Sequence, residues 1–478
     1  MTIASSAVET VFDAPNSRVS RRSLEPTRVA LLSPCGWGNL GDAAIMAAAI
    51  DQIRARQPKA EVVAFTLNPI DTQQRHEIRA FAIDAFTLAG FTVDRVGLSG
   101  ARRLAQRFLQ RVRGSSCRLA NALCRALNLI TLPGRELWHW WQTYRVVRRC
   151  RFVVVCGGGQ VDELWGGPWG HPYALFKFAL LSRLAANRKG ARPRFVVLSS
   201  GSAKLSSGLG RWFVRRALRW ADYRSFREPF AVELARKLRA PEPNLWFPDL
   251  AFSLDVGTKK SVRRGGSPIV GVSPIAWLDP RMWPEKDSQR YEHYFGQLAD
   301  FLRTLLRRKT RVALFATAAA DHVVIADLTR VLREEGTPDL DELIEVSSAR
   351  TVSDLLNVYA SVDVVVASRL HGVLLSYACR VPVVAVSYDP KVEHLVDSFD
   401  QNAACLQIDT LESSQLLKTF DQVWGAREAI SRQLAVKAIA FRELLTDQYD
   451  RVFGALAVQE SSNRVAANAS VLQVGPIA

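Results

Sequence analysis

The stretch VDVVVASRLHGVLLSYACRVPVVAVSYDPKVEHL, residues 362–395, decides the predicted fold. It reads as an apolar strand ending at Ser368, a helix, a second apolar strand at 382–387 and the start of another helix. Short strands that are apolar throughout and alternate with helices are typical of parallel sheets covered by helices on both faces. The stretch therefore predicts an α/β fold.

The same alternation extends over most of the chain and divides into two series. The β-branched runs lie at 28–34, 60–67, 151–159 and 194–201 in the first series, and at 268–274, 311–317, 343–348, 362–368 and 382–387 in the second. A length of 478 residues is ample for two domains. We expect a Rossmann-like domain at 28–254, a polar, glycine-rich linker at 255–267 and a second Rossmann-like domain at 268–458. The segments 1–27 and 459–478 lack periodicity and are expected to be disordered tails.

Composition and motif searches exclude several classes of protein. Hydrophobic residues make up 48% and charged residues 23%, which is ordinary for a globular protein. The seven cysteines are scattered without zinc-ligand spacing, so we expect reduced thiols and no metal. No G-x-S-x-G motif, P-loop lysine or strand-end DxD motif occurs, which disfavours serine hydrolysis, P-loop phosphotransfer and metal-dependent nucleotidyl chemistry. The N-terminal residues do not resemble a secretory signal, and no apolar stretch has membrane-spanning length, so a cytoplasmic location is expected.

Positive charge is concentrated in one segment. The chain carries a net +17, and residues 101–151 hold twelve arginines against the single acid Glu136, a net +11. Apolar residues and three tryptophans are interleaved with these arginines. One reading makes 101–150 a basic amphipathic insertion that docks on an anionic membrane, here the inner membrane face. The other makes it a surface helix whose apolar stripe packs on the domain. No nucleic-acid-binding module accompanies the charge, so nucleic acid is not an expected partner.

The clearest candidate site follows the strand that ends at Ser368. Arg369 and His371 begin the next helix, so a guanidinium, an imidazole and free helix N–H groups converge there. Tyr388 and Lys391 follow the next strand and are placed to join them. In an open α/β sheet, ligands bind at the carboxyl ends of the strands. This arrangement predicts an anion-binding site in a cleft between the two sheets.

A glycine-rich turn follows the first strand. In GWGNLGDAAI, Asn39 and Asp42 lie next to a helix predicted over 43–53. Asp42 either caps that helix or binds and deprotonates a hydroxyl group. The next strand ends without an acid to hold a ribose, so the G-x-G-x-x-G spacing does not indicate a dinucleotide site.

A second glycine-rich stretch, CGGGQVDELWGGPWGHPY, follows the strand ending at Val155. Glycines here, Gly158 and Gly159 among them, let the backbone approach a ligand closely. Its flat rings are of the kind that stack on sugars, and they belong to Trp165, Trp169 and His171. The alternative is a tight turn whose aromatic residues pack at the surface.

Two charged residues upstream are harder to interpret. Arg227 precedes a predicted helix in YRSFREPFAVELARKL, and read by itself it would be solvated. Asp249 in WFPDLAF is a helix cap or a ligand, and nothing in the local sequence decides between these.

Taken in order, these sites resemble the polysaccharide pyruvyltransferase family over roughly residues 28–425. The most specific matches are SRLHG at 368–372 and YDPKV at 388–392. The resemblance implies a GT-B-like fold and an enzyme that moves pyruvate from phosphoenolpyruvate onto sugar hydroxyls, with no cofactor besides this donor. It also implies a donor-binding set, namely Arg369, Leu370, Arg227 and Lys391 together with His371.

Phosphoenolpyruvate carries a carboxylate and a phosphate, which suit bidentate arginines. We expect His371 to act as general acid or base, and Arg369 and Arg227 to stabilise the departing phosphate. Asp42 would orient or deprotonate the acceptor hydroxyl of a glycan, which is a candidate for attachment to a lipid carrier. The acceptor-side set comprises Asn39, Gly158, Gly159, Trp165, Trp169 and His171.

Two other functions stay open from the sequence. One is a GT-B-type glycosyltransferase that uses a nucleotide sugar. The other is a catalytically silent partner in assembly.

Overall fold

The structure is a computed structural model of the chain. It describes residues 27–36, 38–85, 118–164, 166–186, 192–257, 268–283 and 285–454, with side chains from residue 133 onward in the segment that begins at 118. Most of both predicted tails, residues 258–267 of the predicted linker, residues 101–117 of the basic segment and Trp165 lie outside the described residues. The domain boundaries therefore stay a prediction.

The first series of apolar runs forms a sheet in which every strand pair is parallel. Its order is β3-β2-β1-β4-β6-β7-β8, with β5 pairing with β6. The strands are β1 (Arg28–Leu32), β2 (Glu61–Thr66), β3 (Arg79–Ala82), β4 (Phe152–Cys156), β5 (Gly159–Val161), β6 (Arg194–Ser202), β7 (Tyr223–Phe226) and β8 (Leu245–Trp246). The order of the strands in the N-terminal sheet therefore reverses at β1, which lies between β2 and β4.

The second series forms another parallel sheet, of order β11-β10-β9-β12-β13-β14. Its strands are β9 (Ile269–Ser273), β10 (Arg311–Leu314), β11 (Ile344–Val346), β12 (Val364–Ala367), β13 (Val383–Ser387) and β14 (Cys405–Gln407). All nine apolar runs singled out in the sequence contain a strand. The expectation of two Rossmann-like domains with parallel sheets is confirmed.

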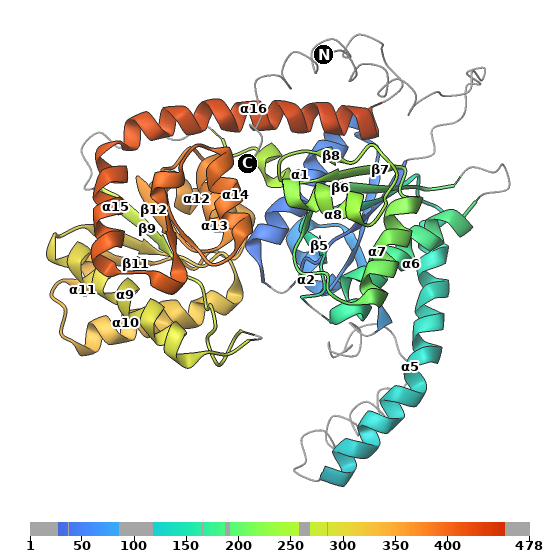
Figure 1. Cartoon of the computed structure of the whole chain (residues 1–478), viewed down its shortest axis with the longest axis horizontal. Coiled ribbons are helices and arrows are strands. Elements are labelled where there is room, and N and C mark those ends of the chain that lie inside the picture. Colours follow the sequence, from blue (N-terminus) through green and yellow to red (C-terminus); the bar gives the residue numbers. More distant parts are fainter. Residues whose placement is uncertain are drawn as a thin grey trace.

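Helices cover both faces of each sheet, as Figure 1 shows. In the N-terminal half they are α1 (Leu40–Arg56), α2 (Pro69–His76), α5 (Arg118–Val147), α6 (His171–Leu184), α7 (Gly208–Trp220) and α8 (Pro229–Lys237), with the short η2 (Gly167–Trp169) and η3 (Leu250–Ser253). In the C-terminal half they are α9 (Ser288–Arg307), α10 (His322–Glu334), α11 (Leu340–Leu343), α12 (Val352–Ser361), α13 (Leu370–Ala378), α14 (Pro390–Ser398), α15 (Ser413–Gly425) and α16 (Arg427–Phe453), with η4 (Ala319–Asp321), η5 (Asn402–Ala404) and η6 (Ile408–Thr410).

Strand side chains alternate between two apolar layers, as the two-residue period of a strand requires. Ala30 and Leu32 of β1 pack with α6, α7 and α8, whereas Val29 and Leu31 face α1 and η3. The layer that contains α1 is continuous with the one under α12 and α13 of the other domain. The two domains therefore meet through a shared apolar core.

Helix α16 fixes this arrangement because it returns from the C-terminal domain and lies across the N-terminal one (Figure 1). The buried Gln448 donates from Nε2 to Ser225 Oγ at 2.7 Å. The Phe453 ring packs edge-on against Phe152, with ring centroids 5.1 Å apart. Both contacts tie the end of the chain to strands of the first sheet.

Candidate active site

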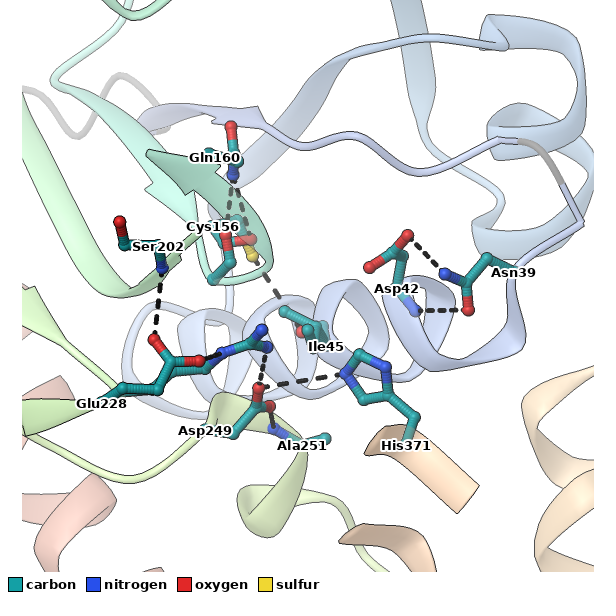
Figure 2. A network of polar contacts seen from close by, with 12 residues as sticks. Asn39, Asp42, Ile45, Cys156, Gln160, Ser202, Glu228, Asp249, Ala251 and His371 are labelled. Carbon is teal, nitrogen blue, oxygen red and sulfur yellow. Dashed lines mark hydrogen bonds and ion pairs between the residues drawn. The ribbon is translucent and has the colours of Figure 1, made fainter. Parts of the chain in front are cut away.

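The β1–α1 turn positions Asp42. Asn39 is the N-cap residue of α1, and its Oδ1 accepts hydrogen bonds from the backbone N–H groups of Gly41 and Asp42. Asn39 Nδ2 donates to Asp42 Oδ2 at 2.8 Å. The reading of Asp42 as the helix cap is therefore wrong: Asn39 caps the helix, which begins at Leu40, and holds the Asp42 carboxylate (Figure 2). The preference of residue types for the N-cap position could not decide between Asn39 and Asp42, because asparagine and aspartate are equally good caps.

The same turn touches the opposite domain. Leu40 N–H donates to Thr317 C=O at 2.8 Å, and Ala319 N–H donates to Gly38 C=O at 3.0 Å. Gly38 has φ +68°, and a Cβ there would lie 2.7 Å from the Ala319 Cβ. The turn thus needs glycine at this position to dock against the segment after β10.

His371 lies in the first turn of α13 and reaches from the C-terminal domain toward residues of the N-terminal one (Figure 2). Its Nε2 is 3.9 Å from Asp249 Oδ2, and within the described part of the chain this nitrogen has no hydrogen-bond partner. Burial lowers the pKa of His371, while the carboxylates of Asp249 and Asp42 oppose this shift. The imidazole is therefore held as a neutral group next to two acids, and added negative charge favours its protonation.

Arg227 is buried at the end of β7 and lies in this same cluster. Its Nε donates to Glu228 Oε1 and its Nη1 to Asp249 Oδ2, both at 2.6 Å. Gly201 makes room for it, since a Cβ there would lie 2.6 Å from Arg227 Nε. The reading of Arg227 as solvated is wrong, because its side chain is buried between two carboxylates. The local sequence could not indicate this, since the second carboxylate comes from a segment 22 residues further along the chain. The two acids more than offset the effect of burial and raise the pKa of Arg227, so it stays charged.

Arg369 occupies the N-cap position of α13 and pairs with a buried acid of its own domain. Its Nε and Nη2 donate to the two carboxylate oxygens of Asp321, the second at 2.8 Å. Asp321 also accepts from the Ala276 N–H at 3.0 Å. These bonds orient the guanidinium, and its Nη1 has no hydrogen-bond partner among the described residues.

Lys391 lies in the first turn of α14, with Nζ 3.4 Å from Asp389 Oδ2. Burial disfavours its charge, but Tyr388 and Asp389 raise the pKa of the ammonium above its usual value. The charges of Lys391 and Arg227 act on each other, and both act on His371. Arg227 and Lys391 thus act on the buried imidazole, and the carboxylate of Asp42 acts on both His371 and Arg369.

The glycine-rich turn after β4 approaches Asp42. Gly157 and Gly158 have φ +52° and +66°, and a Cβ on Gly158 would lie 3.8 Å from Asp42 Oδ1. Burial raises the pKa of Asp42, while Arg227, and the imidazole of His371 when it is protonated, lower it. A carboxylate with a raised pKa is a stronger base, which suits an attack on a hydroxyl proton.

The structure places two of the predicted acceptor-side rings, His171 and Trp169, in different environments. His171 begins α6 and is buried, with Nδ1 3.5 Å from Asp162 Oδ1, and it lies close enough to influence the pKa of Asp42. Trp169 is 54% exposed and packs against Tyr173 and Phe213, with ring centroids 5.6 Å apart in both pairs. The structure therefore brings His171 near the cluster and gives Trp169 surface packing.

Sequence reasoning missed three acids of the site or left them undecided: Asp162, Asp249 and Asp321. Asp249 caps η3 through the Ala251 N–H at 2.9 Å and also binds Arg227, so it is both a cap and a ligand. Asp162 directly follows β5, and Asp321 ends η4 in the segment after β10, so both lie beyond the carboxyl end of a strand, which is the signal that marks such positions. No group of three or more described His, Cys, Asp or Glu side chains is arranged to hold a metal ion.

A family model described as polysaccharide pyruvyl transferase matches residues 39–390, which run from the cap of α1 to the start of α14. The chain belongs to the polysaccharide pyruvyl transferase family. No curated protein sequence is significantly similar to it.

Solved structures share the architecture of this pyruvyl transferase family member at very low sequence identity. The UDP complex of MnaA from S. aureus matches with a TM-score of 0.51 and 8% identity, over 94% of this chain and 99% of that one. UDP-GlcNAc 2-epimerase from Neisseria meningitidis, bound to UDP-GlcNAc, gives 0.50 and 8%, over 88% and 100%. The fold is GT-B-like, as the sequence predicted.

Proposed function

We propose that this chain transfers pyruvate from phosphoenolpyruvate to two hydroxyls of a glycan, which forms a cyclic ketal and releases phosphate. The observation that carries the proposal is the meeting of Arg227 and His371, which come from different domains and share Asp249. A small anion with a carboxylate and a phosphate matches a site lined by two arginines and a lysine.

The proposed reaction balances with the two hydroxyl groups as the only proton sources. One proton reaches the methylene carbon of phosphoenolpyruvate, which becomes a methyl group, and the first hydroxyl oxygen bonds to the adjacent carbon. The bond from that carbon to the phosphate oxygen breaks, and the second hydroxyl oxygen closes the ring. The second proton leaves with the phosphate.

A side chain of the cluster can be proposed for each of these steps. His371 is proposed to exchange the proton with the methylene carbon, because the arriving trianion favours the imidazolium. Arg227 Nη2 and Arg369 Nη1 remain for the departing phosphate after both arginines have bound their carboxylates. Asp42, held by Asn39, is proposed to take the acceptor proton.

The test uses the full chain with phosphoenolpyruvate and a panel of methyl hexopyranosides. We expect phosphate release that depends on one of these acceptors, and a pyruvate ketal detected by mass spectrometry. His371→Gln should fold normally and lose at least about 10²-fold in kcat, the lower end for general acid–base catalysis. Near wild-type turnover in that variant would refute the role of His371.

Binding experiments separate the alternatives. Phosphoenolpyruvate should raise the melting temperature, and UDP-GlcNAc should not. Stabilisation by UDP-GlcNAc alone would indicate a nucleotide-sugar glycosyltransferase. Phosphoenolpyruvate binding without phosphate release on any glycan, including a lipid-linked one, would indicate a catalytically silent protein.

A further inference from the structure

Helix α7 presents an exposed face made of arginine, tryptophan and leucine. Its buried side chains, such as Val214 and Leu218, pack toward the sheet. The side chains it turns to solvent, fully or in part, are Leu209, Arg211, Trp212, Arg215, Arg216, Arg219 and Trp220. No acid occurs in the helix, and the indole of Trp212 is 45% exposed.

The arginines of α7 lack carboxylate partners. Among the described residues, the four arginines of α7 form no ion pair; Arg211 donates to the Ser206 C=O, and the Arg216 guanidinium lies over the Trp212 ring. On the C-terminal domain some exposed arginines pair with carboxylates, as Arg290 does with Asp409 and Arg308 with Asp421, whereas Arg350 and Arg432 have no ion pair among the described residues. The α7 face therefore keeps its full positive charge for an external anion.

The second half of α5 adds a similar surface. From residue 133 its one acid, Glu136, is buried, and its exposed side chains include Leu137, Trp138, Trp141 and Arg145. Trp138 stacks on Trp141 with ring centroids 4.8 Å apart, and the Arg145 guanidinium lies over the Trp141 ring. Leu137 is 72% exposed, which is unusual for a large aliphatic side chain outside an interface.

Helices α5, α6 and α7 cover the same face of the N-terminal sheet. Val147 of α5, Phe178 of α6 and Val214 of α7 belong to one apolar cluster with Val155 and Val197 of the sheet. Helix α6 contacts both α5 and α7 on this face. We call the exposed residues of α7 and of α5 from residue 133 onward the Arg/Trp face.

We propose that the Arg/Trp face docks the protein on a bilayer that contains anionic phospholipids. Unpaired guanidinium groups bind lipid phosphates, and tryptophan and leucine side chains enter the interfacial region between headgroups and acyl chains. A nucleic acid would use the arginines and could stack on indoles, but it gives no role to exposed Leu137 and Leu209. The binding is peripheral, because no described helix combines the length and apolarity needed to span a bilayer.

The inference extends the sequence-based expectation for 101–151 to a helix outside that segment. It does not depend on the proposed reaction, although a lipid-linked acceptor would lie at the same surface. It places the decisive arginines on α7, where every one of them is described.

The test is sedimentation of the full chain with vesicles of phosphatidylcholine alone and of phosphatidylcholine mixed with phosphatidylglycerol. We expect binding to the mixed vesicles at low salt, weak binding to the neutral ones, and loss of binding at high salt. The quadruple variant Arg211→Gln, Arg215→Gln, Arg216→Gln, Arg219→Gln should bind about 600-fold more weakly, since each of the four arginines near an anionic surface contributes roughly five-fold. Trp212→Ser should weaken binding with less effect on its salt dependence.

A charge-matched control replaces four arginines outside the Arg/Trp face with glutamine. Arg54 lies in α1, Arg350 just before α12, and Arg432 and Arg451 in α16, so the control variant is Arg54→Gln, Arg350→Gln, Arg432→Gln, Arg451→Gln. It should keep wild-type binding. Equal loss of vesicle binding in both quadruple variants would overturn the proposal. Release of the protein from vesicles by RNA, but not by added phosphatidylglycerol vesicles, would also overturn it. So would inhibition of vesicle binding by inorganic phosphate at the same concentration as the lipid. Phosphoenolpyruvate binding, measured in parallel by thermal shift, should be unchanged in both variants, so failure of the docking surface stays distinct from failure of the active site.

Discussion

Gly41 of α1 lies directly against the imidazole of His371, although the two residues belong to different domains. A Cβ built on Gly41 would lie 2.3 Å from both Cγ and Nδ1 of His371. The ring is therefore positioned by the backbone of the opposite domain as well as by its own helix. Contact of this kind makes the geometry of His371 depend on the closed arrangement of the two sheets.

Gly41→Ala should lower kcat/KM for pyruvyl transfer by about 10²-fold, because a displacement of roughly 1 Å at a reacting group has effects of that size. Steady-state kinetics with phosphoenolpyruvate and the best acceptor measures it. Gly296→Ala in α9 is the matched control, since its Cβ meets nothing within 4 Å, and it should keep wild-type activity. Full activity in Gly41→Ala would show that the contact with His371 does not constrain catalysis.

Asp249 should set the pH dependence that His371 brings to catalysis. Its carboxylate raises the pKa of His371 against the lowering effect of burial, so Asp249→Asn should lower that pKa further. The limb of the pH profile of kcat/KM that disappears in His371→Gln should therefore move to lower pH in Asp249→Asn. A limb on which activity falls as pH rises identifies the imidazolium as the acid, and the opposite slope identifies a base. An unmoved limb would mean that the carboxylate does not act on His371.

Of the fourteen strands in the described part of the chain, the sequence predicted the nine that lie in its apolar runs and missed β3, β5, β7, β8 and β14. In β7, Arg224 and Ser225 are polar yet buried. Ser225 Oγ donates to Val197 C=O and accepts from Ser199 N–H and Gln448 Nε2, so its burial depends on partners that are remote in the chain. The hydrophobicity of the local sequence cannot predict such partners, so a prediction based on it misses a buried polar strand.

The candidate site shows the same limit. Arg369 and His371 could be found because they share one strand end, and their placement there followed from the α/β pattern. The burial of Arg227 could not be predicted, because it requires Asp249 from a separate loop. Likewise, the pairing of Arg369 with Asp321 depends on how β10 and β12 lie on either side of β9.

His76 should make the protein less stable in acid. Burial is the main cause that lowers the pKa of His76 to about 4, and Arg75 adds to it. An unfolded histidine has a pKa near 6.5, so between these values the unfolded state binds more protons and stability rises with pH. The contribution of His76 is complete above about pH 6.5 and falls by about 2 kcal/mol between pH 7 and pH 5.

Thermal unfolding from pH 7 to pH 5 at constant ionic strength measures this loss. His76→Gln should show a smaller fall in the unfolding temperature over that range than the wild-type protein. Identical slopes for the two proteins would contradict the assignment.

A buried ion pair should account for much of the attachment of α5. Lys177 of α6 is 0% exposed and donates to Glu136 Oε1 of α5 at 2.9 Å, and the Ala85 N–H donates to Glu136 Oε2 at 2.8 Å. Lys177→Met would leave the Glu136 carboxylate buried without its cation, which costs about 3–5 kcal/mol. The double variant Lys177→Met, Glu136→Gln should recover part of this loss, because a neutral amide needs no counterion. Lys418→Met, at an exposed position, should change stability by less than about 0.5 kcal/mol.

Urea unfolding of the four proteins distinguishes an ion pair from simple packing. If Lys177→Met and the double variant lose the same stability, then the charge of Glu136 is not the cause, and the loss comes from the changed shape of the side chain. Recovery in the double variant would instead show that α5, which carries part of the Arg/Trp face, is fixed to the domain through a charge. Vesicle binding should then weaken in Lys177→Met and return with the second substitution, since Trp138 and Trp141 can contribute only while α5 stays in place.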